Sequence, residues 1–529
     1  MQRAPALAAA RGSPPGVWVS VAAALALGAA FTVPLQHTWA WPLSLLCLIA
    51  LLMLLRDASP RRAAVLGWLF SAAWIAGCTW WLFISLHRYG GLPAPLAVMA
   101  VALLALALGL YMALASYVFA RLRSVRHPWR DALMFGLLWW LAEWARARIF
   151  TGFPWGASGY TQVDSPLAGL ALWVGVYGIG AVLAFLAAAL VLMQGAWPRR
   201  AGLLALVLAV PWVGGFITPS FTRATHTISV SLIQTGISQD EKFDARRMPR
   251  HVYQLADSLR NSTSALVLAP ETAIPVLPSE LGPDGFKPFD TPFVDAQGNP
   301  WNAQRGALIG LPLGSFDAGY TNSVAGFGGT RLADNMRYRY NKHHLVPFGE
   351  FIPFGFRWFV EMMNIPLGDF ERGPVGAASF SVAGERIGPN ICYEDLFGEE
   401  LAQRYGAGGD APTMHANVSN IAWFGDTVAI DHHLNISRLR AMELQRPMLR
   451  ATNTGATAVI DHEGNVTASL PRLKRAVLHS EVTGREGLTP YVRLMVMTGG
   501  LGPLALLAAA MVAMLALSRR DFRAPRNGI

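Results

Sequence analysis

The chain has 529 residues, of which 53% are hydrophobic and only 14% are charged, and its mean hydropathy is +0.35. A soluble domain carries about 25% charged residues, so this composition argues against an ordinary soluble protein. The formal net charge of +10 would suit a protein that binds nucleic acid. The arginines, however, are gathered in alternating loops between apolar runs, which argues against that function.

Eight runs of apolar residues are each long enough to span a bilayer, which takes about 20 residues. They lie near 17–35, 38–55, 64–84, 94–120, 131–150, 167–193, 201–217 and 494–517. A single run could be a buried helix of a soluble domain, but eight in one chain favour a polytopic membrane protein. We therefore expect a transmembrane domain of about seven helices over 1–217, and a last transmembrane helix with a tail over 491–529.

Arginines gather in alternating loops between these runs. They lie at the N-terminus, after the second, fourth and sixth runs and after the last run, whereas the opposite short loops carry only Arg88, Arg146 and Arg148. By the positive-inside rule, both termini are expected in the cytoplasm and residues 218–490 on the opposite side of the membrane. If the first run is instead a cleaved signal peptide, that domain stays on the same side. The basic charge is thus a signal of topology, and no nucleic-acid partner is expected.

Residues 218–490 read as a globular domain in which short apolar strands are mixed with helices. The expected strands are Thr227–Ile233, Ala265–Ala269, Ala307–Leu311, Met336–Tyr340, Ile387–Cys392, Thr413–Asn417, Leu449–Asn453, Thr457–Asp461 and Ala476–Val482. The expected helices are Arg246–Arg260, Leu396–Gln403 and Ile430–Gln445. This mixture predicts an α/β layered fold.

Three expected strands end in polar residues that can do chemistry, namely Glu271, Lys342 and Cys392. Desolvation at a buried strand end should raise the pKa of Glu271 and suit it to proton transfer. Cys392 is the only cysteine of this domain and has no disulfide partner within it. It is either a small core residue or a reactive thiol, and the N-terminus of the following helix would favour its thiolate.

Together, three motifs are more specific than the single residues. Ala269-Pro270-Glu271-Thr272, the run from Asn341 to Glu350 (Asn-Lys-His-His-Leu-Val-Pro-Phe-Gly-Glu) and Asn390-Ile391-Cys392-Tyr393-Glu394 resemble the Glu–Lys–Cys set of the carbon–nitrogen hydrolase (nitrilase) superfamily. Within it, three motifs are similar to the apolipoprotein N-acyltransferases: the Lys-x-x-Leu-Val-Pro-Phe-Gly-Glu run, Ala-Trp-Phe-Gly at 422–425 and Arg-Ala-x-Glu-Leu-x-Arg-Pro at 440–447. So is the order of spans and exported domain, and the resemblance covers nearly the whole chain.

The resemblance implies a four-layer αββα sandwich for the exported domain and a two-step acyl transfer without a cofactor. Glu271 would take the proton of Cys392, and Lys342 with the backbone N–H of Tyr393 would hold the oxyanion. The acyl donor would be a phospholipid, in this family usually phosphatidylethanolamine. The acceptor would be the α-amine of the N-terminal diacylglyceryl-cysteine of a lipoprotein.

The family pattern also covers supporting residues. Glu350 matches the glutamate that closes its motif and would orient Lys342 or the nucleophile, while Tyr393 and Glu394 follow the cysteine as the pattern requires. Alternatively, Glu350 is a surface carboxylate and Tyr393 only packs. Phe243 stands where many members have a tryptophan, which leaves an aromatic packing role.

The segment 345–373 is rich in prolines, glycines and large apolar residues. We expect it to be an apolar lid that contacts lipid through Phe348, Phe354, Phe356 and Trp358; the alternative is a loop packed onto the core. The paired histidines at 343–344 and 432–433 do not predict a metal site, because adjacent residues of a regular element cannot both face one ion and no cluster completes the site.

Two other functions remain open at this stage. A membrane-tethered amidase of the nitrilase type would use the same thioester and hydrolyse it with water, but it needs neither a lid nor seven spans. A transporter or scaffold with a degenerate hydrolase domain would need charges within the spans, and few occur beyond Glu143 and Arg146.

Overall fold

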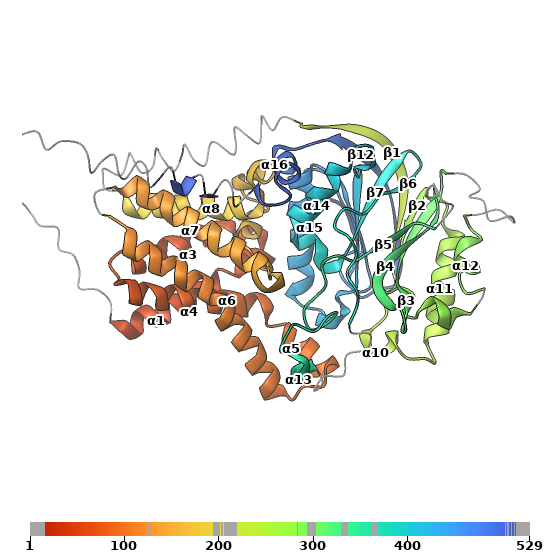
Figure 1. Cartoon of the computed structure of the whole chain (residues 1–529), viewed down its shortest axis with the longest axis horizontal. Helices are drawn as coiled ribbons and strands as arrows, with labels where there is room; N and C mark the ends of the chain where they lie inside the picture. The colour runs from red at the N-terminus through yellow and green to blue at the C-terminus, as the bar shows by residue number, and fades with distance from the viewer. Residues whose placement is uncertain are drawn as a thin grey trace, which may run out of the picture.

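The computed structural model describes residues 16–124, 127–193, 220–282, 284–293, 303–329, 337–360 and 369–502, with isolated positions at 202, 205 and between 504 and 514. Nearly all of the expected span at 201–217, much of the one at 494–517 and both chain ends lie outside the described residues. The described part forms a helical bundle attached to a layered α/β domain (Figure 1). The boundaries expected at 217 and 490 stay predictions.

The bundle accounts for the first six expected spans. Its principal helices are α1 (Val17–Ala30), α3 (Trp41–Leu55), α4 (Pro60–Thr79), α6 (Ala94–Leu122), α7 (Pro128–Arg148) and α8 (Ala171–Leu192), with short α2 (Val33–Gln36) and α5 (Leu82–Ile84) between them. Among the described residues, five helical stretches are long and apolar enough to cross a membrane, at 17–36, 38–55, 60–79, 94–122 and 166–192. This is the structure of a membrane protein.

Helix α7 is the expected fifth span, but its composition sets it apart from the other five. It carries Asp131, Glu143 and Arg146, which are all buried. Arg146 donates to the carbonyls of Phe153 and Trp155, both at 2.8 Å. The polar face of α7 therefore holds the loop that follows it, close to the α/β domain.

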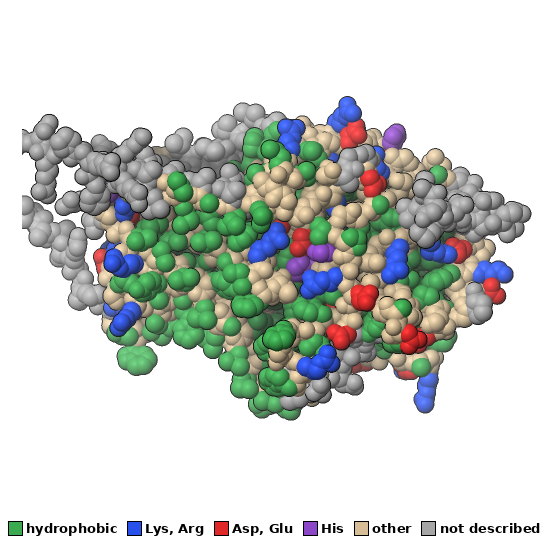
Figure 2. Space-filling view, in the orientation of Figure 1, with side chains coloured by type: hydrophobic (Ala, Val, Ile, Leu, Met, Phe, Trp, Pro, Cys, Tyr) green, Lys and Arg blue, Asp and Glu red, His purple; other side chains and the backbone are tan. Residues whose placement is uncertain are grey.

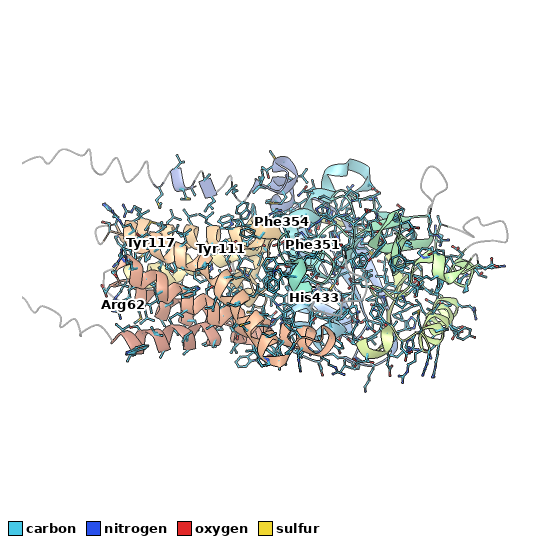
Figure 3. The ribbon with its side chains drawn as sticks, turned by 60° about the horizontal axis from the view of Figure 1, so that its bottom comes forward. Arg62, Tyr111, Tyr117, Phe351, Phe354 and His433 are labelled. Atoms are coloured by element: carbon cyan, nitrogen blue, oxygen red, sulfur yellow. The ribbon has the colours of Figure 1, made fainter. Side chains whose placement is uncertain are left out.

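Apolar side chains cover the outside of the bundle as well as its inside. Inside, Trp74 packs edge-on against Phe31 at 4.9 Å and stacks on Trp139 at 5.9 Å between ring centroids. Outside, the bundle presents a mostly hydrophobic surface with basic side chains at the end far from the α/β domain (Figure 2), where Arg62 lies (Figure 3). Exposed apolar side chains on the outside of a helical bundle are expected where the helices lie in lipid.

The α/β domain contains two six-stranded mixed sheets. The first has the order β12 (Ala476–Gly487), β1 (Thr222–Gln234), β2 (Leu266–Leu268), β3 (Gly306–Ser315), β4 (Gly319–Gly328), β5 (Arg339–Asn341). The second has the order β11 (Val466–Ser469), β10 (Ala458–Ile460), β9 (Met448–Thr452), β8 (Met414–Ser419), β7 (Glu385–Ile391), β6 (Phe380–Val382). The pairs β1–β2, β2–β3, β7–β8 and β8–β9 are parallel, and the other pairs are antiparallel.

Alternation along the strands creates the layers. In β2, Leu266 and Leu268 face the core between the two sheets, whereas Val267 faces the outer helices. Helices α11 (Met248–Asn261) and α12 (Lys287–Asp290) cover one outer face, and α14 (Gly398–Gln403) and α15 (Val428–Leu444) cover the other (Figure 1). The prediction of a four-layer αββα sandwich is confirmed.

The bundle packs directly on the helical layer of the second sheet. Residues of α15, such as Ile436 and Leu439, belong to the same apolar cluster as the bundle interior. A buried polar contact joins the two parts as well: the carboxylate of Glu443, which pairs with Arg440 on the same helix, accepts from the backbone N–H of Val176 at 2.8 Å. A short helix, α16 (Pro490–Thr498), closes this side of the domain.

The expected strands and helices are present, with ends that differ by a few residues, but three strands were missed. These are β4, β6 and β11. Strand β4 reads Gly-Tyr-Thr-Asn-Ser-Val-Ala-Gly-Phe-Gly, and its small and polar residues lack the β-branched alternation by which strands are recognised. Strand β4 is held in the sheet by its hydrogen bonds to β3 and β5.

Candidate active site

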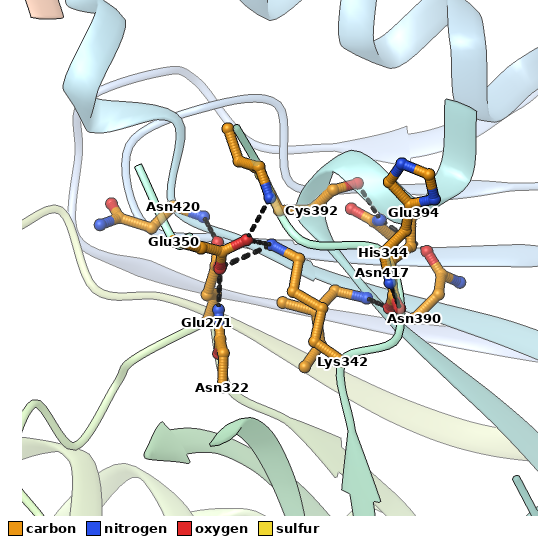
Figure 4. A network of polar contacts seen from close by, with 12 residues as sticks. Glu271, Asn322, Lys342, His344, Glu350, Asn390, Cys392, Glu394, Asn417 and Asn420 are labelled. Carbon is orange, nitrogen blue, oxygen red and sulfur yellow. Dashed lines mark hydrogen bonds and ion pairs between the residues drawn. The ribbon is translucent and has the colours of Figure 1, made fainter. Parts of the chain in front are cut away.

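The three polar residues at strand ends lie together at one edge of the sandwich. Glu271 follows β2 and Lys342 follows β5, both in the first sheet, while Cys392 follows β7 in the second (Figure 4). The ammonium nitrogen of Lys342 lies 3.5 Å from Oε1 of Glu271. Both residues act electrostatically on the Cys392 thiol. The structure therefore brings the predicted Glu, Lys and Cys into one cluster of polar side chains, which we call the pocket.

Glu271 is buried, and hydrogen bonds hold both of its carboxylate oxygens. Asn322 Nδ2 donates to Oε1 at 2.7 Å, and the backbone N–H of Asn420 donates to Oε2 at 2.8 Å. Strand β3 passes so close that a Cβ at Gly310 would lie 2.6 Å from the Cα of Glu271. Glycine is required there because any side chain would displace the Glu271 main chain.

Glu350 is the second buried carboxylate of the pocket. It lies 2.9 Å from the Lys342 ammonium, and it accepts from Asn322 Nδ2 at 2.6 Å and from the backbone N–H of Val346 at 2.7 Å. Burial opposes the charge of Lys342, but Glu350 and Glu271 outweigh it and hold the pKa of Lys342 above its ordinary value. Lys342 is therefore a fixed positive charge, and Glu350 is not the surface carboxylate of the alternative interpretation.

Cys392 stands at a sharp turn between β7 and a short 3₁₀ segment, η7 (Cys392–Leu396), with a φ of +51°. A non-glycine residue in the left-handed region is uncommon and costs about 1–3 kcal/mol, a strain typical of functional sites. The backbone carbonyl of Cys392 accepts hydrogen bonds from Asn417 Nδ2 and from His433 Nε2, both at 3.1 Å. These two bonds hold the turn in place.

The expectation that a helix terminus favours the Cys392 thiolate is wrong for the resting site. The residues after Cys392 form a 3₁₀ turn, and α14 begins only at Gly398. Burial is the main cause that raises the pKa of the Cys392 thiol well above its ordinary value, and the negative charge of Glu271 is the second. The positive charge of Lys342 offsets only part of this shift. The thiol is protonated at rest and needs a base beside it.

A buried ionic network supports the turn from behind. His433 Nε2 lies 3.0 Å from Asp395 Oδ1, and Arg450 lies 3.2 Å from Asp395 Oδ2. Burial alone would raise the pKa of Asp395, but His433 and Arg450 lower it below its ordinary value. The carboxylate is thus charged, and it orients the histidine that holds the Cys392 carbonyl.

Glu394 ties the Cys392 turn to the strand end that bears Lys342. Its carboxylate accepts from the Tyr340 hydroxyl at 2.8 Å and from the backbone N–H groups of His343 and Ile391, both at 2.7 Å. Burial raises its pKa, and the charge of Lys342 opposes that shift. Glu394 lies two residues from the thiol and fixes the distance between the two sheets at the pocket.

Tyr393 links the pocket to the bundle. Its hydroxyl donates to the backbone carbonyl of Gly152 at 3.3 Å, in the loop after α7, and its ring packs on Phe397 at 5.2 Å. Phe243 packs against the ring of Trp423 at 6.5 Å, in keeping with an aromatic packing role. Both aromatics thus lie between the pocket and the membrane part of the chain.

The candidate lid residues are largely exposed. Phe354 is fully exposed, Trp358 is 61% exposed and Phe356 is 44% exposed. Phe348 has a φ of +64° and packs edge-on against Phe356 at 5.3 Å. Near the junction of bundle and α/β domain, Phe351 and Phe354 lie close together (Figure 3). The alternative of a loop packed onto the core does not describe Phe354, Phe356 and Trp358, whereas Phe348 is half-buried. Contact of this segment with lipid stays a prediction.

The paired histidines have separate partners. His343 contacts the carbonyl of Gly373, and His344 contacts Glu400. In the other pair, His432 accepts from Trp155 at 3.3 Å, and His433 serves the Cys392 turn. Among the described residues, no group of three His, Cys, Asp or Glu side chains could hold a metal ion.

Sequence reasoning missed several residues that shape the pocket. Asn322 lies on the unrecognised strand β4, and Asn420 acts through its backbone N–H, which no side-chain pattern encodes. His433 was considered only as a metal ligand. The buried Lys242, next to Phe243, was also missed.

Comparison with known proteins agrees with this architecture. The model of the apolipoprotein N-acyltransferase N-terminal domain matches residues 23–189, and that of the carbon-nitrogen hydrolase family matches residues 320–491. The first match covers the bundle and the second covers the strands that carry Lys342 and Cys392. Fold and pocket therefore define a membrane-bound enzyme whose α/β domain is of the carbon–nitrogen hydrolase type.

Curated relatives are similar over nearly their whole length. The apolipoprotein N-acyltransferase of Verminephrobacter eiseniae is 48% identical, over 88% of this chain and 91% of the relative. The enzyme of Ralstonia nicotianae is 44% identical, over 91% of this chain and 91% of the relative. That of Bordetella bronchiseptica is 40% identical, over 91% of this chain and 93% of the relative. The chain belongs to the apolipoprotein N-acyltransferase family and is an acyltransferase.

Proposed function

We propose that this enzyme moves an acyl chain from a phospholipid, through a thioester on Cys392, to the α-amine of the N-terminal diacylglyceryl-cysteine of lipoproteins. The observation that carries the proposal is the pocket itself, in which a protonated thiol, a carboxylate and a fixed ammonium converge. The named activity of the relatives supplies the acceptor. Phosphatidylethanolamine is the proposed donor.

In the first half-reaction, Glu271 takes the proton of Cys392, and the sulfur attacks the ester carbonyl carbon of the phospholipid. The carbonyl π electrons move onto oxygen, and this oxyanion is stabilised by the ammonium of Lys342 and the backbone N–H of Tyr393. When the intermediate collapses, the C–O bond breaks and the alkoxide of the lysophospholipid takes the proton from Glu271. A thioester on Cys392 remains.

In the second half-reaction, the α-amine attacks the thioester carbonyl carbon, and Glu271 takes a proton from the nitrogen. The C–S bond breaks, an amide is formed, and the Cys392 sulfur recovers its proton from Glu271. The high pKa that burial gives the thiol favours this return to the protonated resting state. Glu350 keeps Lys342 charged and directs it in both half-reactions.

The proposed location is the bacterial inner membrane, with the α/β domain in the periplasm and both termini in the cytoplasm. Basic side chains lie at the end of the bundle that is far from the α/β domain, as Arg62 does (Figure 3). By the positive-inside rule that end faces the cytoplasm, which supports the proposal. The pocket would then lie at the outer leaflet, where diacylated lipoproteins and donor lipid are both accessible.

The test is a single-turnover assay with acyl-labelled phosphatidylethanolamine, followed by addition of a diacylated lipopeptide. Native enzyme should release lysolipid only to the extent of one thioester, hold the labelled acyl chain on Cys392 and then pass the label to the peptide amine. We expect Glu271→Gln and Lys342→Ala each to slow thioester formation by about 10²–10³-fold or more. A variant that forms thioester normally and fails only in transfer would show that the roles are assigned to the wrong step. Release of labelled free fatty acid in place of labelled peptide would favour the amidase alternative.

A further inference from the structure

The chain makes its positive charges almost entirely from arginine. Of its 43 lysines and arginines, only four are lysines: Lys242, Lys287, Lys342 and Lys474. Two of these four are buried, Lys342 with 1% and Lys242 with 3% of its surface exposed. Arginine stays protonated in proteins, whereas lysine can lose its proton when buried. A buried lysine of this chain can therefore change its charge, which a buried arginine cannot. The proposed half-reactions use only one of the two buried lysines, Lys342.

Lys242 lies against the main chain of the proposed base. It ends the short helix α10 (Gln239–Lys242), and its Nζ donates to the backbone carbonyl of Glu271 at 3.0 Å. The same helix reaches Glu271 a second way, because Gln239 Oε1 accepts from Asn420 Nδ2 at 3.1 Å. Asn420 in turn donates its backbone N–H to the Glu271 carboxylate. Helix α10 thus holds Glu271 at its carbonyl and, through Asn420, at its carboxylate.

Helix α10 is itself anchored to the membrane part of the chain. Asp240 forms an ion pair of 2.6 Å with Arg88, in the helical turn η2 (Ser85–Tyr89) that follows α5. The aromatic rings of Tyr89 and Phe243 both pack on Trp423, at 5.6 and 6.5 Å. In Figure 1, α10 lies at the same lower edge of the molecule as α5. Its position relative to Glu271 is thereby fixed from the bundle side.

Few charges face the Lys242 ammonium. Burial lowers its pKa to about 7, and the two groups that oppose this shift are Glu271, after β2, and the Cys392 thiol, after β7. On α10 itself, Asp240 and Glu241 pair with arginines at the surface. Across the pocket, Lys342 and Glu350 act on the same thiol. Glu271 and Cys392 are the two residues between which the first proton transfer is proposed.

We propose that Lys242 is a positioning residue whose ammonium form fixes the main chain of Glu271 and so aims its carboxylate at the Cys392 thiol. This inference rests on the proposed role of Glu271 as the base. A charged donor makes a hydrogen bond about twice as strong as a neutral one. The bond from Lys242 to the Glu271 carbonyl is therefore strong while the ammonium is protonated and weaker after it loses its proton.

The test compares native enzyme with Lys242→Met and Lys242→Arg in single-turnover thioester formation from phosphatidylethanolamine between pH 5.5 and 9. Methionine removes the donor and keeps an unbranched chain, whereas arginine keeps a charged donor. The control is Lys287→Met, which changes an exposed lysine of helix α12. Thermal denaturation in detergent identifies variants that fail to fold.

Below pH 7 we expect Lys242→Met to be about 10- to 100-fold slower than native enzyme, the effect of one charge-assisted hydrogen bond. The ratio of native to variant rates should fall as the pH rises through about 7, because native Lys242 then loses its charge. Lys242→Arg should recover part of the rate and keep it at high pH. A ratio that stays constant with pH, or a native rate in Lys242→Met, would overturn the proposal.

The same assay separates failure of this inference from failure of the proposed function. If Cys392→Ala forms no thioester and Lys242→Met behaves as native enzyme, only the role of Lys242 is wrong. If Cys392→Ala still transfers the acyl chain, the proposed mechanism is wrong, and the role of Lys242 is overturned with it.

Discussion

The ammonium of Lys342 lies 2.9 Å from the carboxylate of Glu350 and is therefore closer to Glu350 than to the proposed base, Glu271, at 3.5 Å. A lysine that paired fully with the base would neutralise it. Glu350 is thus the nearer partner of the ammonium, while the Glu271 carboxylate is also held by Asn322 and the backbone N–H of Asn420. The arrangement keeps the charge proposed to stabilise the oxyanion apart from the proposed base.

We expect Glu350→Gln to slow thioester formation by about 100-fold, comparable to losing one preorganised electrostatic contact. Lys342 would then have Glu271 as its remaining carboxylate partner, and the stronger pair would make Glu271 a poorer base. Single-turnover lysolipid release measures the effect. Glu371→Gln, which removes an exposed carboxylate, is the matched control, and a native rate in Glu350→Gln would show that Glu350 does not act on Lys342.

The charges around Cys392 predict how the pKa of its thiol differs between variants. Glu271 raises the pKa of the thiol and Lys342 lowers it. The midpoint of thiolate formation should therefore move to lower pH in Glu271→Gln and to higher pH in Lys342→Met, with native enzyme between them. Thiolate absorbance against pH, with Cys392→Ala subtracted in each background, measures the midpoint. Coinciding midpoints, or the reverse order, would contradict this account of the pocket.

The exposed aromatic segment gives a prediction about lipid access. Aromatic side chains are favourable at the membrane interface, and Phe354, Phe356 and Trp358 are all exposed. We expect replacement of all three by serine to impair turnover of bilayer phospholipid, while the reaction of Cys392 with a small soluble thiol reagent changes little. A variant that unfolds would show that the segment is core, and one that turns over bilayer lipid normally would show that it is not a lipid contact.

The contact between bundle and α/β domain gives a prediction about stability. Arg440 and Glu443 are fully buried, and removing one partner of a buried ion pair costs about 3–5 kcal/mol because the other charge is left behind. We expect Glu443→Gln to lower the thermal midpoint in detergent strongly. Glu486→Gln breaks the exposed pair with Arg223 and should cost less than about 1 kcal/mol. Equal shifts in the two variants would contradict the importance of the buried pair.

The sequence predicted those parts of the site that follow buried strands. Position at the ends of expected strands marked Glu271, Lys342 and Cys392 as candidates, and the resemblance to the carbon–nitrogen hydrolases indicated that they act together. Asn322 could not be found this way, because its strand forms only through pairing with its neighbours. Lys242 sits on a helix of four residues, too short for any periodic signal. Its burial depends on tertiary contacts alone.

The pKa of Cys392 was misjudged for a similar reason. A helix terminus can be read from sequence, but the desolvation of a thiol and its distance from a carboxylate come from the packing of two sheets against each other. The same holds for Glu350, whose burial depends on Asn322 and Val346. Sequence patterns thus predicted which residues meet, and the packing determined their charge states.

The most direct test of the account is the mass of the protein itself. Native enzyme incubated with phosphatidylethanolamine and no acceptor should gain one acyl group, and peptide mapping should place it on Cys392. Hydroxylamine or a diacylated lipopeptide should remove it, while Cys392→Ala, which keeps the thiols of Cys47 and Cys78, should gain none. Acyl transfer to the lipopeptide by Cys392→Ala, or an acyl group on another residue of native enzyme, would contradict the thioester mechanism.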